Sequence, residues 1–169
     1  MLGAQNRGSF EFGGGVSFPG EMTQDYGRGS NQRIAANLYG EYRYQLWKGF
    51  HLSLQYQLMP EWDHFVEEDN NDRVHSFWYL THTLNALAEY RMFASKNVSP
   101  FIGVGAGPQY QHGLSEESRQ WKEWGLDLHV RAGVELFHRL RLSAGHLHGD
   151  HSTFRAAQPA YYFSVGWVF

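Results

Sequence analysis

The residues best suited to chemistry in this sequence are its ten histidines, which gather most densely near the C-terminal end. His146 and His148 stand two positions apart, so on a β-strand both rings would project from one face, as two ligands of one metal ion must. Asp150 could orient an imidazole ring, and His151 follows it directly. Because such spacing alone is weak evidence for a site, we interpret these four residues as a polar cluster in a loop at the rim of the fold. No catalytic residue and no metal is assigned.

Other patterns that often mark chemical sites are incomplete in this chain. It has no cysteine, which excludes disulfides, thiolate catalysis and cysteine-bound zinc. Residues 13–15 are three glycines, but they lie inside an alternating segment with no helix after them, so they do not form a phosphate-binding loop. The acidic run 67–72 lacks the ligand spacing of a calcium loop, so we interpret it as a solvated loop. No cofactor is predicted.

A period of two residues dominates the sequence and predicts the β-strands that must position any site. The period is clearest over residues 126–136, where six apolar residues alternate with polar or small ones such as Asp127, Arg131 and Glu135. The same alternation predicts further strands over about 9–18, 36–46, 52–58, 81–92, 102–107, 140–144 and 161–169.

The links between these segments alternate between long and short. The long polar links are 19–33, 60–75, 112–123 and 148–159, and the short ones are 47–49, 95–99 and 138–139. Long outer loops and tight turns at the other end are typical of a membrane β-barrel. We therefore predict a single domain over residues 1–169, an all-β, transmembrane, antiparallel up-and-down barrel of about eight strands. An even number of strands places both termini on the periplasmic side.

Charge falls on one face of the predicted strands, and this decides which face meets lipid. The apolar faces carry no Lys, Arg, Asp or Glu and are rich in aromatic side chains. A soluble barrel would place the apolar side chains inside, so here the apolar face must meet lipid and the charged face must line the interior. In so narrow a barrel the interior charges would pair across strands and leave no open pore. The predicted lumen charge network is Glu11, Glu41, Arg43, Glu89, Arg91, Asp127, Arg131, Glu135 and Arg141.

The composition narrows the class of protein further. Aromatic residues make up 17% of the chain and glycines number 19, yet the mean hydropathy is −0.52, because apolar and polar residues are interleaved. No apolar run approaches the ~18 residues that mark a membrane helix. The net charge of −3 and the lack of a basic tract argue against a nucleic-acid partner.

Two segments resemble a known family. Residues 100–107 and the aromatic ending 161–169 resemble the small outer-membrane barrels of Gram-negative bacteria, typified by outer membrane protein X and the membrane domain of outer membrane protein A. The ending resembles the signal that the outer-membrane assembly machinery reads, and it places these residues at alternate positions: Tyr161, Phe163, Val165, Trp167 and Phe169. The resemblance implies an outer-membrane location, insertion by that machinery, and contact with the lipid bilayer and lipopolysaccharide.

The resemblance does not imply one activity, because a fold does not fix a function. We expect a non-enzymatic barrel, a structural, adhesive or accessory subunit that acts through its extracellular loops or its wall, alone or beside a larger outer-membrane protein complex. One alternative is a lipid A-modifying enzyme, because outer-membrane lipid A deacylases are also eight-stranded barrels, with a His-x-Ser pattern and a Glu near the last two strands. Here Ser152 follows His151 directly and no Glu follows Glu135. The other alternative is a narrow porin.

Overall fold

The structure of the protein, a computed structural model, describes residues 7–19, 23–24, 27–28, 34–67, 73–115, 120–151 and 159–169. No helix in these ranges is long and apolar enough to cross a membrane. The strands are β1 (Gly8–Pro19), β2 (Thr23–Gln24), β3 (Gly27–Arg28), β4 (Ala35–Trp47), β5 (Phe50–Glu67), β6 (Arg73–Arg91), β7 (Val98–Ser115), β8 (Gln120–Leu136), β9 (Leu140–His151) and β10 (Pro159–Val168).

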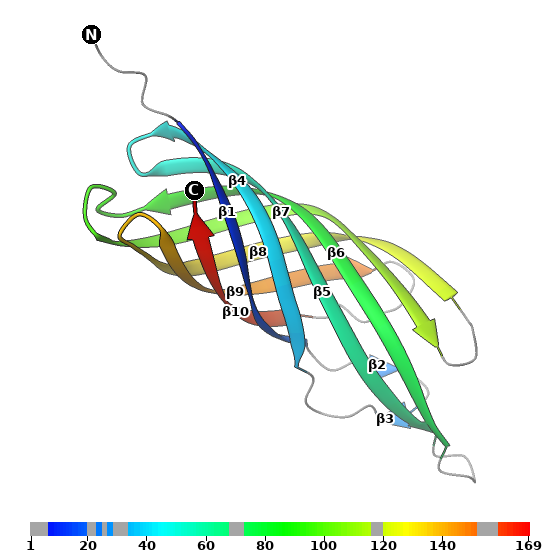
Figure 1. Cartoon of the computed structure of the whole chain (residues 1–169). Helices are drawn as coiled ribbons and strands as arrows, with labels where there is room; N and C mark the ends of the chain where they lie inside the picture. The colour runs from blue at the N-terminus through cyan, green and yellow to red at the C-terminus, as the bar shows by residue number, and fades with distance from the viewer. Residues whose placement is uncertain are drawn as a thin grey trace.

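Eight of these strands close into an antiparallel barrel in the order β1-β10-β9-β8-β7-β6-β5-β4 (Figure 1). The barrel closes at β1, which pairs with β10 on one side and with β4 on the other. A closed sheet has no free edge, so the wall satisfies its own backbone hydrogen bonds, as a bilayer requires. The predicted fold class, an eight-stranded up-and-down barrel, is confirmed. The short strands β2 and β3 form a separate two-stranded sheet.

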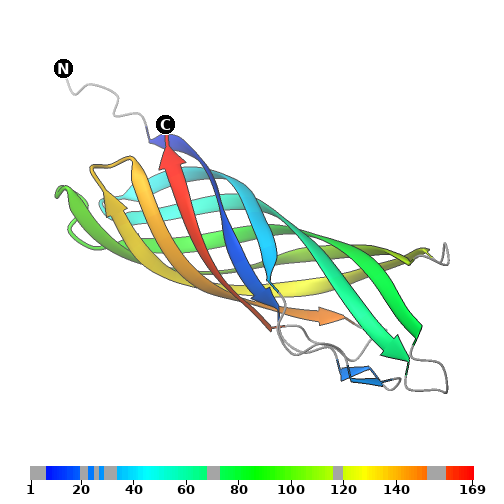
Figure 2. The same cartoon turned by 60° about the horizontal axis from the view of Figure 1, so that its bottom comes forward.

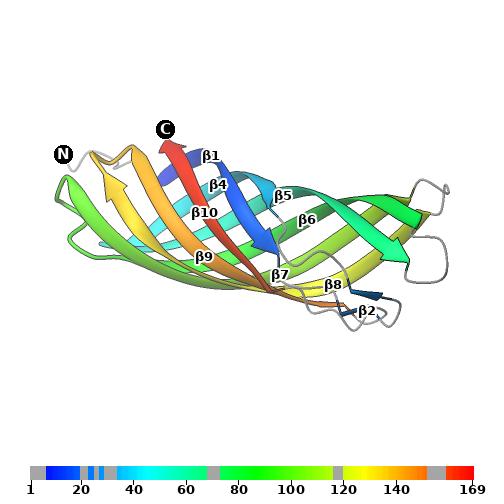
Figure 3. The same cartoon turned by 90° about the horizontal axis from the view of Figure 1, so that it is seen from below.

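The start of β1 and the end of β10 lie at the same end of the barrel as three tight turns, as Figures 2 and 3 show. These turns join β4 to β5, β6 to β7 and β8 to β9, and they use left-handed backbone conformations at Gly49, Phe93, Phe137 and His138. A side chain at Gly49 would also meet the carbonyl oxygen of Arg91, so both φ and space require glycine there. We call this the tight-turn end.

At the opposite end, two hairpins continue well beyond the other strands. β5 and β6 stay paired out to Glu67 and Arg73, and β7 and β8 stay paired out to Leu114 and Gln120. β5 to β8 have 18, 19, 18 and 17 residues, whereas the other four wall strands have 10 to 13. The barrel is therefore asymmetric, with one half of its wall extended.

These extensions correct three of the predicted loops. The stretches 60–75 and 112–123 are strand over most of their length, and β9 runs on to His151, into the predicted loop 148–159. The loop prediction relied on the loss of an apolar face. In the extensions, one set of alternate positions is mostly polar and the other is less uniformly apolar than in the wall, so the sequence pattern there does not distinguish a strand from a loop.

Along every wall strand, side chains alternate between the outside and the interior. On β1, Phe12 is 59% exposed and its neighbour Glu11 is 1% exposed. The outward side chains form an apolar and aromatic wall that includes Phe10, Leu38, Leu54, Tyr90, Ile102, Val104, Leu128, Val130, Phe163 and Val165. This wall is the lipid-facing surface of a transmembrane barrel.

The interior is packed in two zones. Near the tight-turn end it holds charged side chains from most of the strands. Toward the extended end it holds an apolar cluster made of Met59, Leu147, Ala160 and Tyr162, each 5% exposed or less. The core of this protein is therefore the filled lumen, and its charged zone is the candidate functional site.

Candidate functional site

Eight of the nine residues that the sequence assigns to the lumen charge network meet in one cluster. Seven of them are no more than 4% exposed, and the side chain of the eighth, Arg91, is 14% exposed. They supply four carboxylates and four guanidiniums, so the cluster is electrically balanced. Its members come from five strands: Glu11 on β1, Glu41 and Arg43 on β4, Glu89 and Arg91 on β6, Arg131 and Glu135 on β8, and Arg141 on β9.

Arg131 joins opposite sides of the barrel. Its Nη1 donates to Oε2 of Glu41 at 2.5 Å and its Nη2 donates to Oε1 at 2.7 Å, so the planar guanidinium meets the carboxylate at both oxygens. Nη2 also donates to Oε2 of Glu89 at 2.7 Å. Because β4 and β8 are not neighbours in the sheet, this contact crosses the lumen.

Arg141 makes a second crossing contact and packs on an aromatic ring. Its Nη1 donates to Oε2 of Glu11 at 3.0 Å, and its Nη2 donates to Oε2 of Glu89 at 2.7 Å. Its Cζ lies 3.7 Å from the centre of the Phe101 ring. Phe101 is buried, so the ring covers the guanidinium with a desolvated cation–π contact. One carboxylate, that of Glu89, is thus shared by two arginines.

Glu135 is the acid closest to the tight-turn end. Nη1 of Arg43 donates to its Oε2 at 3.1 Å, and Nη1 of Arg91 pairs with its Oε1. Arg43 also lies within ion-pair distance of two deeper acids, at 3.7 Å from Glu11 and 3.9 Å from Glu89. Arg43 therefore links the two ends of the cluster.

The register places two like charges directly opposite each other, since Glu11 on β1 pairs with Glu41 on β4. Like charges in this position repel. Two neutral donors help the arginines to offset the repulsion: Tyr39 Oη donates to Glu11 at 2.6 Å, and Gln55 Nε2 donates to Glu41 at 3.1 Å. The carboxylates of Glu11 and Glu41 therefore each accept hydrogen bonds from one arginine and one neutral side chain.

The ninth predicted member, Asp127, lies in the lumen but outside this cluster. It is fully buried, and its Oδ2 accepts a hydrogen bond of 2.6 Å from Asn85. At the base of the apolar zone, the His129 ring and the Tyr162 hydroxyl share a hydrogen bond of 2.6 Å. Asp127 and His129 thus mark the boundary between the charged zone and the apolar zone.

Aromatic residues in the lumen lie across from glycines on neighbouring strands. Tyr39 faces Gly13, Phe101 faces Gly133, and Tyr162 faces Gly145. A Cβ added at each of these glycines would collide with the facing ring. Sequence reasoning placed Tyr39 and Tyr162 on the interior side by alternation, but it gave the aromatic rings no role. The signal that could have found them is an aromatic residue on the polar face near an inward glycine.

Chemically, the cluster can brace the wall and close the lumen. Every carboxylate in it already accepts from an arginine, and no described nucleophile lies among them. Ion pairs this deeply buried are costly to break, because removing one partner leaves an uncompensated charge. The cluster therefore has a structural role, because its ion pairs hold strands on opposite sides of the barrel together.

The histidine cluster predicted at the rim is only partly described. His146 and His148 lie on the outer face of β9, with ring centres 6.2 Å apart, and the His146 ring packs on Tyr161 at 4.6 Å. The side chains of Asp150 and His151 lie outside the described residues. The described residues contain no group of three or more potential metal ligands.

A second outward patch of rings spans β5 to β8. The Tyr56 hydroxyl and His82 Nδ1 share a hydrogen bond of 2.6 Å, and the His82 and His112 rings stack at 5.5 Å. Tyr110 packs on Trp124 at 4.7 Å. These amphipathic rings lie where the long strands leave the apolar wall, which is the usual position of interfacial aromatics.

The proposed assembly signal lies on the last strand and faces outward. Tyr161, Phe163, Val165 and Trp167 alternate with buried or half-buried residues on β10 and are 45 to 60% exposed, and Phe169 follows at 73%. Their positions agree with a row of lipid-facing side chains next to the strand that closes the barrel.

The closed eight-stranded wall, the apolar exterior and the charged interior define a small transmembrane β-barrel. Comparison with solved structures agrees on the fold. Neisserial surface protein A aligns with a TM-score of 0.63 at 11% identity, covering 95% of both chains. Outer membrane protein OprG from Pseudomonas aeruginosa aligns with a TM-score of 0.64 at 13% identity, covering 96% of both chains.

A third similar structure is the attachment invasion locus protein of Yersinia pestis, with a TM-score of 0.59 at 14% identity, covering 96% of this chain and 97% of the other. No protein-family model matches the sequence, and the search of curated proteins gives no match. At such low identities the shared feature is the barrel itself, so the activity must be argued from this chain's own residues.

Proposed function

We propose that this chain is a non-enzymatic outer-membrane protein that acts through its outer surfaces and not through its lumen. In this proposal the tight-turn end faces the periplasm, and the two long hairpins face the outside of the cell among the lipopolysaccharide. The protein serves as an adhesive or accessory subunit that binds a partner at these hairpins, alone or beside a larger outer-membrane protein.

The observation that carries the proposal is the filled lumen. The charged cluster closes the zone near the tight turns, with Arg131 and Arg141 reaching across it. Beyond it, Met59, Leu147 and Tyr162 pack into an apolar cluster. An ion would have to displace paired charges and then cross an apolar constriction, so a porin function is disfavoured.

The length of the two hairpins supports a function at the surface outside the membrane. A β-strand needs about 9–11 residues to cross a bilayer. Strands β5 to β8 have 17 to 19 residues, so a long part of each projects beyond the lipid. This projecting sheet offers a protein surface beyond the apolar wall to which a partner could bind.

The sequence of the first hairpin indicates the charge of its partner. Residues 61–72 contain six acidic residues and no Lys or Arg. Such a segment attracts a basic surface and repels an acidic one. The Yersinia attachment protein has been solved with the heparin analogue sucrose octasulfate, which is an anionic ligand. The opposite charge of this hairpin supports a different kind of partner here, a protein with a basic patch.

Conductance in a planar bilayer tests the closed lumen. We expect the purified protein to insert without steps of conductance above the baseline. The double variant Arg131→Ala/Arg141→Ala, if it folds, provides the positive control for a loosened lumen. Regular ion-conducting steps from the wild-type protein would contradict the proposal and favour a narrow porin.

Site-specific photo-cross-linking tests the hairpin surface. A cross-linking residue at Lys122, which is exposed on the extension of β8, is compared with one at Lys48 in a tight turn. In native outer membranes we expect a discrete protein adduct from position 122 only. Replacing the acids at 67–69 and 72 with their amides should weaken it. Adducts with lipopolysaccharide alone, or adducts indifferent to those charges, would contradict the proposal.

The mass of lipid A tests the absence of enzymatic activity. We expect it to be unchanged when the protein is produced in an outer-membrane host. A lost acyl chain that returns in a His148→Ala or His151→Ala variant would make the chain a lipid A-modifying enzyme.

A further inference from the structure

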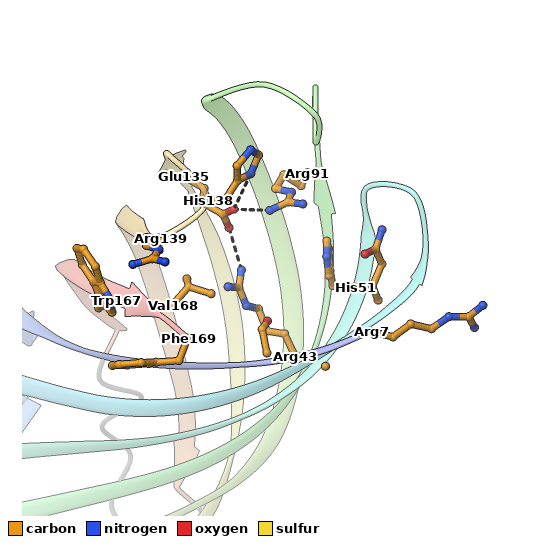
Figure 4. A pocket seen from close by; sticks show the side chains of 13 residues that line it. Arg7, Arg43, His51, Arg91, Glu135, His138, Arg139, Trp167, Val168 and Phe169 are labelled. Atoms are coloured by element: carbon orange, nitrogen blue, oxygen red, sulfur yellow. Dashed lines mark hydrogen bonds and ion pairs between the residues drawn. The ribbon is translucent and has the colours of Figure 1, made fainter. Parts of the chain in front are cut away.

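The tight-turn end of the barrel is hollow. A cavity of about 650 Å³ opens there, and its floor is the outermost part of the charged cluster, formed by Arg43, Arg91 and Glu135 (Figure 4). Its side walls include Arg7 at the start of β1 and Arg139 in the turn between β8 and β9. The volume lies within the range of sites that bind small molecules.

The cavity carries more positive charge than its acids can balance. Glu135 is the single acidic side chain in its lining, and Arg43 and Arg91 already share that carboxylate. The guanidinium of Arg139 adds one more charge and forms no ion pair with an acid of the described residues, whereas the Arg7 side chain extends away from the cavity (Figure 4). The surplus belongs to the cavity, because the cluster beneath it is balanced.

Three hydrogen-bonding atoms in the lining also lack a hydrogen-bond partner. His51 is 6% exposed, and its Nδ1 has no hydrogen-bond partner within the protein. The same is true of Nε of Arg43 and Nε of Arg91. Buried polar atoms are nearly always satisfied, so such atoms beside a cavity indicate where a ligand or water is held. His51 lines the cavity at its inner wall (Figure 4).

We propose that this cavity is a binding site for a small multivalent oxyanion that bears phosphate or carboxylate groups. Arg139 holds the anion at the rim through charge-assisted hydrogen bonds, and a guanidinium suits such planar or tetrahedral oxyanions. His51 and Arg91 offer hydrogen bonds at the floor. In the proposed topology the site opens to the periplasm, so the anion comes from that side. The site is separate from the hairpin surface and does not depend on the proposed function.

The test is calorimetric titration of the refolded full chain in a non-ionic detergent. The probes are pyrophosphate and citrate, each at the same fixed ionic strength, with chloride as the background anion. Arg139→Gln removes one charge-assisted contact without touching the ion-pair cluster. We expect it to weaken binding about tenfold. His51→Phe keeps an aromatic ring at this position but removes the hydrogen-bonding nitrogens, so it should also weaken binding.

Lys48→Gln and Lys96→Gln are the matched controls. Both lysines lie in tight turns at the same end, but neither lines the cavity. We expect these variants to bind as the wild type does. Binding of both probes supports a general oxyanion site, and binding of one identifies phosphate or carboxylate as the preferred group. No binding at about 10 mM, or equal weakening by the lysine controls, would overturn the site.

Discussion

Arg131 shows what one side chain contributes to this barrel. It donates three hydrogen bonds to two acids on other strands and is almost completely buried. At the scale of the residue, the charges in the lumen depend on one another. Removing one charged side chain leaves its partners buried without a counter-charge. The cost of burying these charges is offset only while all of them are paired.

Arg131→Met should therefore destabilise the folded barrel by about 3–5 kcal/mol, because Glu41 loses its two-point partner and Glu89 loses one of two arginines. The measurement is urea unfolding in lipid vesicles, followed by tryptophan fluorescence. Arg139→Gln, at an exposed turn position, is the matched control and should change stability by less than about 0.5 kcal/mol. Equal stability of the two variants would show that the ion pairs are not structural.

Gly13→Ala should also destabilise the barrel, by about 1–3 kcal/mol, because the added methyl group would collide with the Tyr39 ring. Moving that ring would break its hydrogen bond to Glu11. The same unfolding assay checks this prediction. Gly103→Ala is the control, because its methyl group would meet nothing closer than 3.4 Å. A Tyr39→Phe background should reduce the difference, since the hydrogen bond is already gone.

At the scale of the element, each strand has one face for lipid and one for the lumen. Strand β7 shows this division clearly, since Ile102, Val104 and Ala106 face outward while its glycines face inward. The glycines keep the strand thin on the inside, where Arg131 and Leu87 need space. The same strand then continues as a water-exposed ladder with β8.

Val104→Arg should cost about 2–4 kcal/mol, because the new charge would lie on the lipid face near the middle of the bilayer. Trp124→Arg, nearer to the end of the apolar wall, should cost about 0–1 kcal/mol. Both are measured as unfolding free energies in phosphatidylcholine vesicles. A similar small effect at both positions would mean that the wall is not in lipid at Val104.

The last strand carries a separate prediction, because we propose that its alternating aromatic row is an assembly signal. Phe169→Ala should reduce the amount of protein inserted in the outer membrane of cells several-fold. It should leave refolding into detergent nearly unchanged, because Phe169 is 73% exposed. Equal effects in cells and in detergent would assign Phe169 a role in stability and none in recognition.

At the scale of the whole molecule, alternation in the sequence was enough to predict the fold. Each of the nine charged residues assigned to the interior is placed there by the structure, because a period of two fixes the face of a residue once the strand is known. The partners could not be predicted. Arg131 meets Glu41 across the lumen, 90 positions away, and no local pattern encodes that distance.

The length of the two long hairpins also could not be predicted from the alternation in the sequence. The stretch from Pro60 to Glu67 mixes polar and apolar residues on each face, so it looks like a loop even though it pairs with β6 throughout. The oxyanion cavity was missed for a similar reason. His51, Arg91 and Arg139 are scattered along the chain and are brought together only when the barrel closes.

The central claim is that the apolar face of this barrel meets lipid and the charged face is enclosed. Because the chain has no cysteine, single cysteines at Leu52, Leu54, Val104 and Leu128 can carry spin labels without background. In a phospholipid bilayer, all four labels should be mobile and accessible to oxygen, and shielded from a water-soluble nickel complex. A label at Lys122 should show the opposite preference. Immobile labels inaccessible to both reagents would mean that these side chains form the core of a soluble barrel, and would contradict the account.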